Sequence, residues 1–221
     1  MIKTPSRAAL LLALTLLAPA ALAQQKISKV NGGISVEAGQ AYGDVETVNG
    51  GITLGDNATV EDAETVNGGI KGGNNVRASS LSTVNGGIRL GTQAVIGGDV
   101  ETVNGGIFLD RGSQVGGDVE TVNGAIGLVG TRLAGGIETV NGDITVGIDS
   151  HVKGGIRVIK PKRNVSLQKR DPRVVIGPNA VVEGALVFER PVTLYVHRTA
   201  RTGAVTGATA QSFDTPTAPV D

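Results

Sequence analysis

Acidic side chains recur in a fixed local pattern, and they are the groups in this sequence best able to do chemistry. The pattern is Asp (once Gly), an apolar residue, Glu and Thr, and it precedes five copies of a Val-Asn-Gly motif. Carboxylates can bind cations, and a pair of them can hydrolyse a glycosidic bond. The recurring acids are Asp44, Glu46, Asp62, Glu64, Asp99, Glu101, Asp118, Glu120 and Glu138.

The repetition of these acids argues against catalysis, because no single converging pair stands out. The chain has no cysteine and only 2% aromatic residues, and sugar-cleaving grooves usually need aromatic platforms. His151 and His197 are isolated, with no neighbouring nucleophile or metal-ligand spacing. We therefore predict a non-enzymatic protein without a cofactor. A carbohydrate-active enzyme is the least favoured alternative.

Binding of a ligand or cation is the main alternative to a purely structural role. The Asp-x-Glu columns could hold Ca²⁺ through carboxylate oxygens, but calcium takes six to eight ligands and a surface column offers few per ion. A polysaccharide is the other ligand considered. The net charge of zero argues against a nucleic-acid partner.

A basic segment near the C-terminal third is the second charged feature. Its interpretation is open between a solvated loop and a docking site for an anionic partner. The bases concerned are Lys160, Lys162, Arg163, Lys169, Arg170 and Arg173.

All these residues are embedded in an internal repeat built on the pentapeptide Val-Asn-Gly-Gly-Ile. Its asparagines are separated by 18, 18, 18, 19, 19 and 18 residues, which is the signature of a solenoid. The asparagines are Asn31, Asn49, Asn67, Asn85, Asn104, Asn123 and Asn141.

One repeat, residues 49–66, contains three short segments in which apolar and polar residues alternate, each bounded by Gly, Asn or Asp. This pattern predicts three strands per coil. The predicted fold is all-β: a single-stranded, triangular, parallel β-helix of about nine coils of 18–19 residues. The right-handed habit of parallel crossovers favours a right-handed helix.

Equivalent residues of successive coils would form columns along the rod, about 4.8 Å apart. The asparagines are then expected to form a structural amide ladder, and the Asp and Glu columns are expected to face outward. The second glycine of the pair is replaced by Ala125 and Asp143, which indicates that only the first is sterically demanding. The sequence leaves open whether Thr or Val of the Thr-Val-Asn step faces the core.

The chain divides into three predicted parts. Residues 1–23 have the basic flank, apolar stretch and small-residue cleavage site of a signal peptide. Residues 24–206 form the β-helix, with repeats over 24–159, a basic loop insertion over 160–173 and closing coils over 174–206. Residues 207–221 are expected to be a disordered tail. Export to the periplasm, the cell surface or the medium follows, with no transmembrane segment after signal cleavage.

The Val-Asn-Gly-Gly-Ile coils joined by Gly-Asp-Val-Glu-Thr resemble bacterial adhesin β-helix domains. The segment from Val175 to Gly184 is similar to coils of bactofilins, a polymer-forming cytoskeletal family. The resemblance implies a right-handed β-helix and end-to-end polymerisation without nucleotide. Residues 24–150 carry a net charge of −8 and residues 151–221 a net charge of +6. We therefore expect a structural or adhesive rod of the bacterial envelope that forms homo-oligomers or polymers, or contacts an envelope component.

Overall fold

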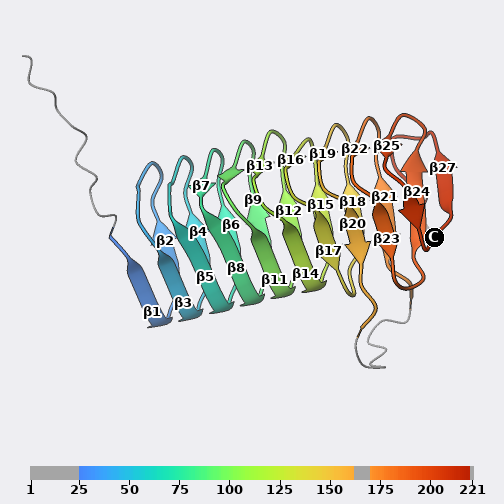
Figure 1. The fold of residues 1–221 in the computed structure, drawn as a ribbon. Coiled ribbons are helices and arrows are strands. Elements are labelled where there is room, and N and C mark those ends of the chain that lie inside the picture. The colour runs from blue at the N-terminus through green and yellow to red at the C-terminus, as the bar shows by residue number, and fades with distance from the viewer. Residues whose placement is uncertain (1–24, 162–169, 220–221) are drawn as a thin grey trace, which may run out of the picture.

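The computed structural model describes residues 25–161 and 170–219 of the protein. In these two ranges the regular structure consists of strands, which stack into three parallel sheets along one rod (Figure 1). Two sheets have ten strands and the third has seven, so nine turns of chain separate the first strand from the last of the first sheet. The predicted triangular parallel β-helix is confirmed. The predicted signal peptide lies outside the described residues.

Sheets A, B and C are named here by their strands. Sheet A contains β1 (Ile27–Asn31), β3 (Val45–Asn49), β5 (Asp62–Asn67), β8 (Ser80–Asn85), β11 (Val100–Asn104), β14 (Val119–Asn123), β17 (Ile137–Thr139), β20 (Ile156–Val158), β23 (Leu186–Phe188) and β26 (Val205–Thr206). Sheet B contains β2 (Ile34–Val36), β4 (Ile52–Leu54), β6 (Ile70–Gly72), β9 (Ile88–Leu90), β12 (Ile107–Leu109), β15 (Ile126–Leu128), β18 (Ile144–Val146), β21 (Arg173–Ile176), β24 (Thr193–His197) and β27 (Ala210–Phe213). Sheet C contains β7 (Arg77–Ala78), β10 (Val95–Ile96), β13 (Gln114–Val115), β16 (Arg132–Leu133), β19 (His151–Val152), β22 (Val181–Val182) and β25 (Arg201–Thr202).

The core is a continuous stack of small and medium aliphatic side chains. Alternate residues of each strand point inward, so in β4 Ile52 and Leu54 are buried while Thr53 is exposed. The same columns continue through β6, β9 and β12 in register. A narrow triangular interior has room for Val, Ile, Leu and Ala, which explains why the chain needs few aromatic residues.

The corner between sheets B and C places one residue of each coil in the left-handed backbone region. These residues have φ between 51° and 77°, a region that Gly adopts freely and that Asn and Asp tolerate best among other residues. They are Gly39, Asn57, Asn75, Gln93, Gly112, Gly130, Asp149 and Asn179. Gln93 is the one member of this set that is not Gly, Asn or Asp.

The corner between sheets A and B explains the glycine pair. A Cβ on Gly86 would overlap the backbone carbonyl oxygen of Gly68 in the preceding coil. A Cβ on Gly87 would lie 2.9 Å from the Gly106 carbonyl oxygen, so a side chain there requires a small backbone shift. Ala125 and Asp143 occupy this second position in later coils. The first glycine is thus required by the close approach of two backbones.

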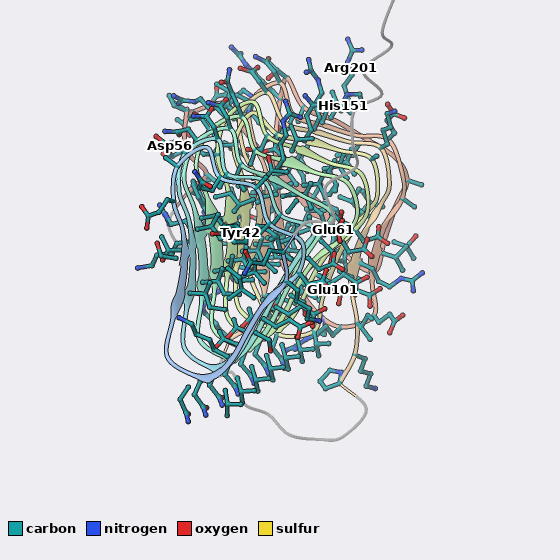
Figure 2. The ribbon with its side chains drawn as sticks, turned by 90° about the vertical axis from the view of Figure 1, so that its left-hand side faces the viewer. Tyr42, Asp56, Glu61, Glu101, His151 and Arg201 are labelled. Atoms are coloured by element: carbon teal, nitrogen blue, oxygen red, sulfur yellow. The ribbon has the colours of Figure 1, made fainter. Side chains whose placement is uncertain are left out.

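The N-terminal end of the stack is covered by one aromatic ring. Ala41 pairs with Thr59, so the next residue, Tyr42, stands in the inward column above Val60. Figure 2 looks at this end of the rod and shows Tyr42 within the ring of strands. Its partly buried side chain packs against the aliphatic core.

The C-terminal end corrects one prediction. Residues 207–221 were predicted to be a disordered tail, but Ala210–Phe213 form β27, which pairs in parallel with β24. The reason is a second small cluster on the outer face of sheet B, in which Phe213 packs with Val175 and Tyr195. The polar composition of this segment predicted disorder. Phe213 instead packs on sheet B and helps to keep β27 paired with β24.

The predicted closing coils continue the columns of the earlier coils. Val174 and Ile176 stand in line with Ile144 and Val146, and Leu186 pairs with Ile156. None of the described residues forms a helix long and apolar enough to cross a membrane.

Candidate binding face on sheet A

In the Thr-Val-Asn step, where the sequence left the orientation open, the threonine side chain faces the core. Thr47, Thr65, Thr83, Thr102 and Thr121 are buried, with at most 4% of their surface exposed. Each hydroxyl donates a hydrogen bond of 2.8–3.0 Å to the carbonyl oxygen of the first glycine of the preceding corner. The threonine column therefore ties each coil to its neighbour and satisfies a polar group inside the core.

Valine consequently faces outward and forms an apolar stripe along sheet A. Five of its members have nearly equal exposed fractions, between 38% and 40%, and Val30 at the open end has 67%. The stripe consists of Val30, Val48, Val66, Val84, Val103 and Val122. Equal exposure on successive coils makes this a straight, regular apolar surface.

A column of glutamates runs beside the valine stripe on the same face. Strand register places Glu46, Glu64, Ser82, Glu101, Glu120, Glu138 and Arg157 in line. Both ends of the column meet a cation: the Lys26 Nζ lies 2.6 Å from the Glu46 Oε1, and the Arg157 Nη1 lies 3.8 Å from the Glu138 Oε2. No ion pair within the described residues involves the central members.

Glu120 is the member of this column whose carboxyl has a raised pKa. Partial burial raises the pKa above its usual 4.5, and Glu138, Glu101, Asp118 and Asp99 raise it further. Burial is therefore the larger cause, and repulsion from the neighbouring acids adds to it. A cation bound here would relieve the repulsion.

The aspartate column has a different task from the glutamate column. The Asp99 Oδ1 accepts a hydrogen bond of 2.7 Å from the amide of Asp118, and the Asp118 Oδ1 accepts one of 2.5 Å from the amide of Gly136. The Asp62 carboxylate accepts a hydrogen bond from the Ser80 hydroxyl at 2.7 Å. These carboxylates bridge consecutive coils at the corner between sheets C and A, a role that the sequence pattern did not reveal.

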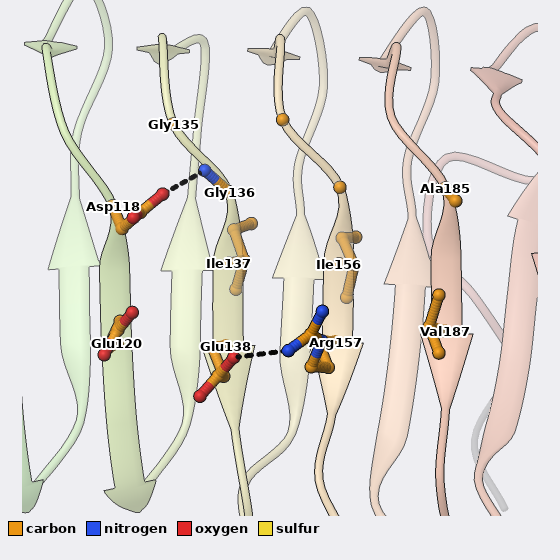
Figure 3. Close-up of a pocket in the computed structure, with 12 residues that line it drawn as sticks. Asp118, Glu120, Gly135, Gly136, Ile137, Glu138, Ile156, Arg157, Ala185 and Val187 are labelled. Carbon is orange, nitrogen blue, oxygen red and sulfur yellow. Dashed lines mark hydrogen bonds and ion pairs between the residues drawn. The ribbon is translucent and has the colours of Figure 1, made fainter.

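A shallow groove of about 510 Å³ crosses the C-terminal part of this face (Figure 3). Glu120, Glu138 and Arg157 point into it from β14, β17 and β20. Glycines 135, 136, 154 and 155 form its floor at the corner. The groove is open, and its carboxylates Glu120 and Glu138 belong to one column along the rod.

The asparagines form an uninterrupted amide ladder at the corner of sheets A and B. Each Nδ2 donates to the Oδ1 of the asparagine one coil earlier, at 2.9–3.0 Å, from Asn141 back to Asn31. Sequence reasoning missed how the ladder ends: the Arg190 Nη1 donates to the Asn141 Oδ1 at 2.7 Å and to the Val140 carbonyl at 3.1 Å.

The basic segment is partly engaged within the chain. Arg170 forms two hydrogen bonds with the Asp143 carboxylate, at 3.0 and 2.5 Å, and the Arg173 amide donates to it at 2.9 Å. Burial alone would raise the pKa of Asp143, but these contacts outweigh it and hold the pKa below 3.8. The Lys160 amide bonds to Glu189 at 3.3 Å. Lys162, Arg163 and Lys169 lie outside the described residues.

Each histidine has a single polar side-chain neighbour among the described residues. The His151 Nε2 lies 2.6 Å from the Glu183 Oε1 on the surface, and the buried His197 Nδ1 lies 2.9 Å from the Thr199 hydroxyl. Over residues 25–161 and 170–219, no three His, Cys, Asp or Glu side chains are grouped closely enough to hold a metal ion.

No protein-family model, curated protein or solved structure matches this chain.

Proposed function

We propose that this protein is a non-catalytic, exported rod of the bacterial envelope that serves a structural or adhesive purpose and associates end to end. The observation that carries the proposal is that each recurring residue either holds adjacent coils together or faces outward on sheet A. Thr, Asn, Asp and the first glycine hold adjacent coils together. Val and Glu remain for contact with partners.

Open sheet edges support self-association. β1 and β2 each pair with one strand only, and β26 and β27 lie at the opposite edges. Such edges carry unpaired amides and carbonyls, which must be covered or will pair with another chain. The opposite net charges of the two halves favour head-to-tail contact.

The expected location rests on the signal-peptide pattern of residues 1–23 and on the resemblance to adhesin coils. A rod held together by ladders of hydrogen bonds on every coil suits an environment that exposes it to proteases. The resemblance of the segment from Val175 to Gly184 to bactofilin coils supports polymerisation without nucleotide.

Sedimentation velocity on the purified chain, over a range of concentrations and at low and high salt, tests the proposal. A concentration-dependent series of oligomers, or filaments under negative stain, is expected. High salt is expected to weaken association, because charges of opposite sign are screened.

An edge variant makes the test specific. The Ile34 amide donates to Gly51 in the next coil, so the neighbouring Ser35 amide faces the open edge. Ser35→Pro removes an edge donor without removing a hydrogen bond of the stack, and it should abolish association. Ser35→Ala is the matched control and should associate normally. A wild-type monomer at every concentration would reject end-to-end assembly.

A further inference from the structure

A second groove lies on the outer face of sheet B, away from the acidic face. It has a volume of about 500 Å³ and lies over β6, β9, β12, β15 and β18. Strand register aligns Lys71, Arg89, Phe108, Gly127 and Thr145 in one outward column along it. We call this the B-face groove.

The groove exists because large side chains are missing in two places: along the neighbouring corner column, and at Gly127 in the outward column itself. One border is the column of second corner residues, Gly69, Gly87, Gly106 and Ala125. Within the outward column, Gly127 follows Phe108, and a Cβ there would lie 3.3 Å from the Phe108 Cδ2. Glycine at 127 therefore leaves room for the aromatic ring to lean over the next coil.

The polar lining of the B-face groove is cationic. The Arg89 guanidinium carbon lies 4.4 Å from the centroid of the Phe108 ring, a cation–π contact that orients the side chain. Lys71 and Arg89 are both exposed, and no acidic residue lines the groove. Neither cation forms an ion pair within the described part of the chain, whereas Lys26 and Arg157, beside and on sheet A, do. Asp143, one coil beyond Ala125 in the corner column, is paired with Arg170.

Two unneutralised cations beside an aromatic ring call for an anionic ligand that also has an apolar face. An added peptide strand does not fit, because β9 and β12 are interior strands of a ten-stranded sheet and their backbone groups are already paired. A sugar acid fits better: its carboxylate can bind Arg89 and Lys71, and its C–H face can stack on Phe108.

The repeat of the rod also suits a polymer. Successive coils advance the column by about 4.8 Å, which is close to the length of one sugar ring in a linear chain. We propose that the B-face groove binds a linear polysaccharide of uronic-acid units that runs along the rod axis. Lys71 and Arg89 bind the carboxylates, Phe108 stacks on a ring, and Thr145 offers a hydroxyl at the far end. This inference does not depend on end-to-end assembly.

Titration calorimetry of the full chain with polygalacturonate tests the inference, with neutral dextran and polyglutamate as comparison ligands. Arg89→Gln and Lys71→Gln keep most of the aliphatic stem and remove the charge, and each should weaken polygalacturonate binding about tenfold. Phe108→Leu keeps an apolar side chain but loses the flat ring, and it should weaken polygalacturonate binding without affecting polyglutamate. Arg77→Gln, which removes an exposed cation from sheet C, is the control and should bind like wild type.

Several results would overturn the inference. Absence of polygalacturonate binding by the wild-type chain, or equal binding by all variants, would remove the site. Equal affinity for dextran would show that the anion is unnecessary, and insensitivity to Phe108→Leu would reduce the groove to a charged patch. Loss of self-association in Arg89→Gln, with polygalacturonate binding unchanged, would assign the groove to contacts between rods instead.

Discussion

At the scale of single residues, the left-handed corner of sheets B and C shows how strictly one backbone angle selects side chains. Seven of its eight described members are Gly, Asn or Asp, and the eighth is Gln93 with φ of 59°. A left-handed conformation costs an ordinary L-residue roughly 1–2 kcal/mol, and a short polar side chain lowers that cost. Gln93 is therefore a locally strained residue in an otherwise matched column.

Gln93→Asn should raise the free energy of unfolding by about 0.5 to 1 kcal/mol, because the backbone is unchanged and the strain is reduced. Thermal or denaturant unfolding measures the change. Gln114→Asn, on strand β13, is the control and should give no gain, since Asn is disfavoured in strands. An unchanged melting temperature for Gln93→Asn would contradict the strain argument.

The raised pKa of Glu120 predicts that ionisation of this carboxyl lowers the free energy of unfolding. Its pKa is higher in the folded state than in the unfolded chain, so the unfolded chain loses the proton first as pH rises. Ionisation therefore lowers stability above its usual pKa of 4.5, and the penalty is absent below it. Glu120→Gln should raise the melting temperature at about pH 7, by an amount worth less than about 1 kcal/mol.

The same variant should give no gain at about pH 3, where both states are protonated. Glu46→Gln is the matched control, because Glu46 is paired with Lys26 at 2.6 Å and its loss should not stabilise the fold. A gain from Glu120→Gln that persists at acid pH would point to packing instead of charge.

At the scale of elements, the asparagine ladder is directional. Every amide donates toward the N-terminal end, so the carbonyl oxygens all point toward the C-terminal end, where Arg190 supplies a cation. A charged donor at the oxygen end is favourable for the same reason that charge-assisted hydrogen bonds are strong. Arg190 thus closes a ladder that begins more than a hundred residues earlier in the chain.

Arg190→Gln should lower the free energy of unfolding by about 1.5 to 3 kcal/mol, because partly buried acceptors at Val140 and Asn141 lose a charged donor. Chemical denaturation provides the measurement. Arg201→Gln, an exposed arginine on β25, should cost much less. Equal losses in the two variants would show that the ladder does not need its cap.

At the scale of the whole molecule, the rod is a one-dimensional stack in which strands pair only with those of adjacent coils, although Arg190 reaches past one coil to Asn141. Its ends differ: Tyr42 covers one inside the core, and Phe213 holds the other through ring contacts outside it. The Phe213 ring lies 5.0 Å from the His197 ring and 6.5 Å from the Tyr195 ring, both edge to face. Loss of the packing at one end should therefore destabilise mainly the coils at that end.

Phe213→Ala should destabilise the last coil by about 2 kcal/mol and leave the distant coils nearly unchanged. Hydrogen exchange is the appropriate measurement: amides of β24 and β27 should lose protection, while those of β9 keep theirs. Gln211→Ala, an exposed position on β27, is the control. Uniform loss of protection along the rod would mean that the stack unfolds as a single cooperative unit.

The sequence by itself determined the period, the three strands per coil, the number of coils and the identity of the columns. These follow from local rules, because a strand alternates every second residue and a repeat returns to the same place after one turn. The sequence also indicated that the first glycine of the corner pair is required, because later coils replace only the second glycine.

Only the tertiary structure decided which of Thr and Val faces the core, because parity across a corner depends on the backbone angles of the corner. It also decided that Asp62, Asp99 and Asp118 bridge coils through hydrogen bonds, while the glutamates line the outer face of sheet A. Arg190 and Asn141 are 49 residues apart, and Arg170, within the basic loop, is 27 residues from Asp143. Such contacts obey no period, so packing in three dimensions had to bring them together.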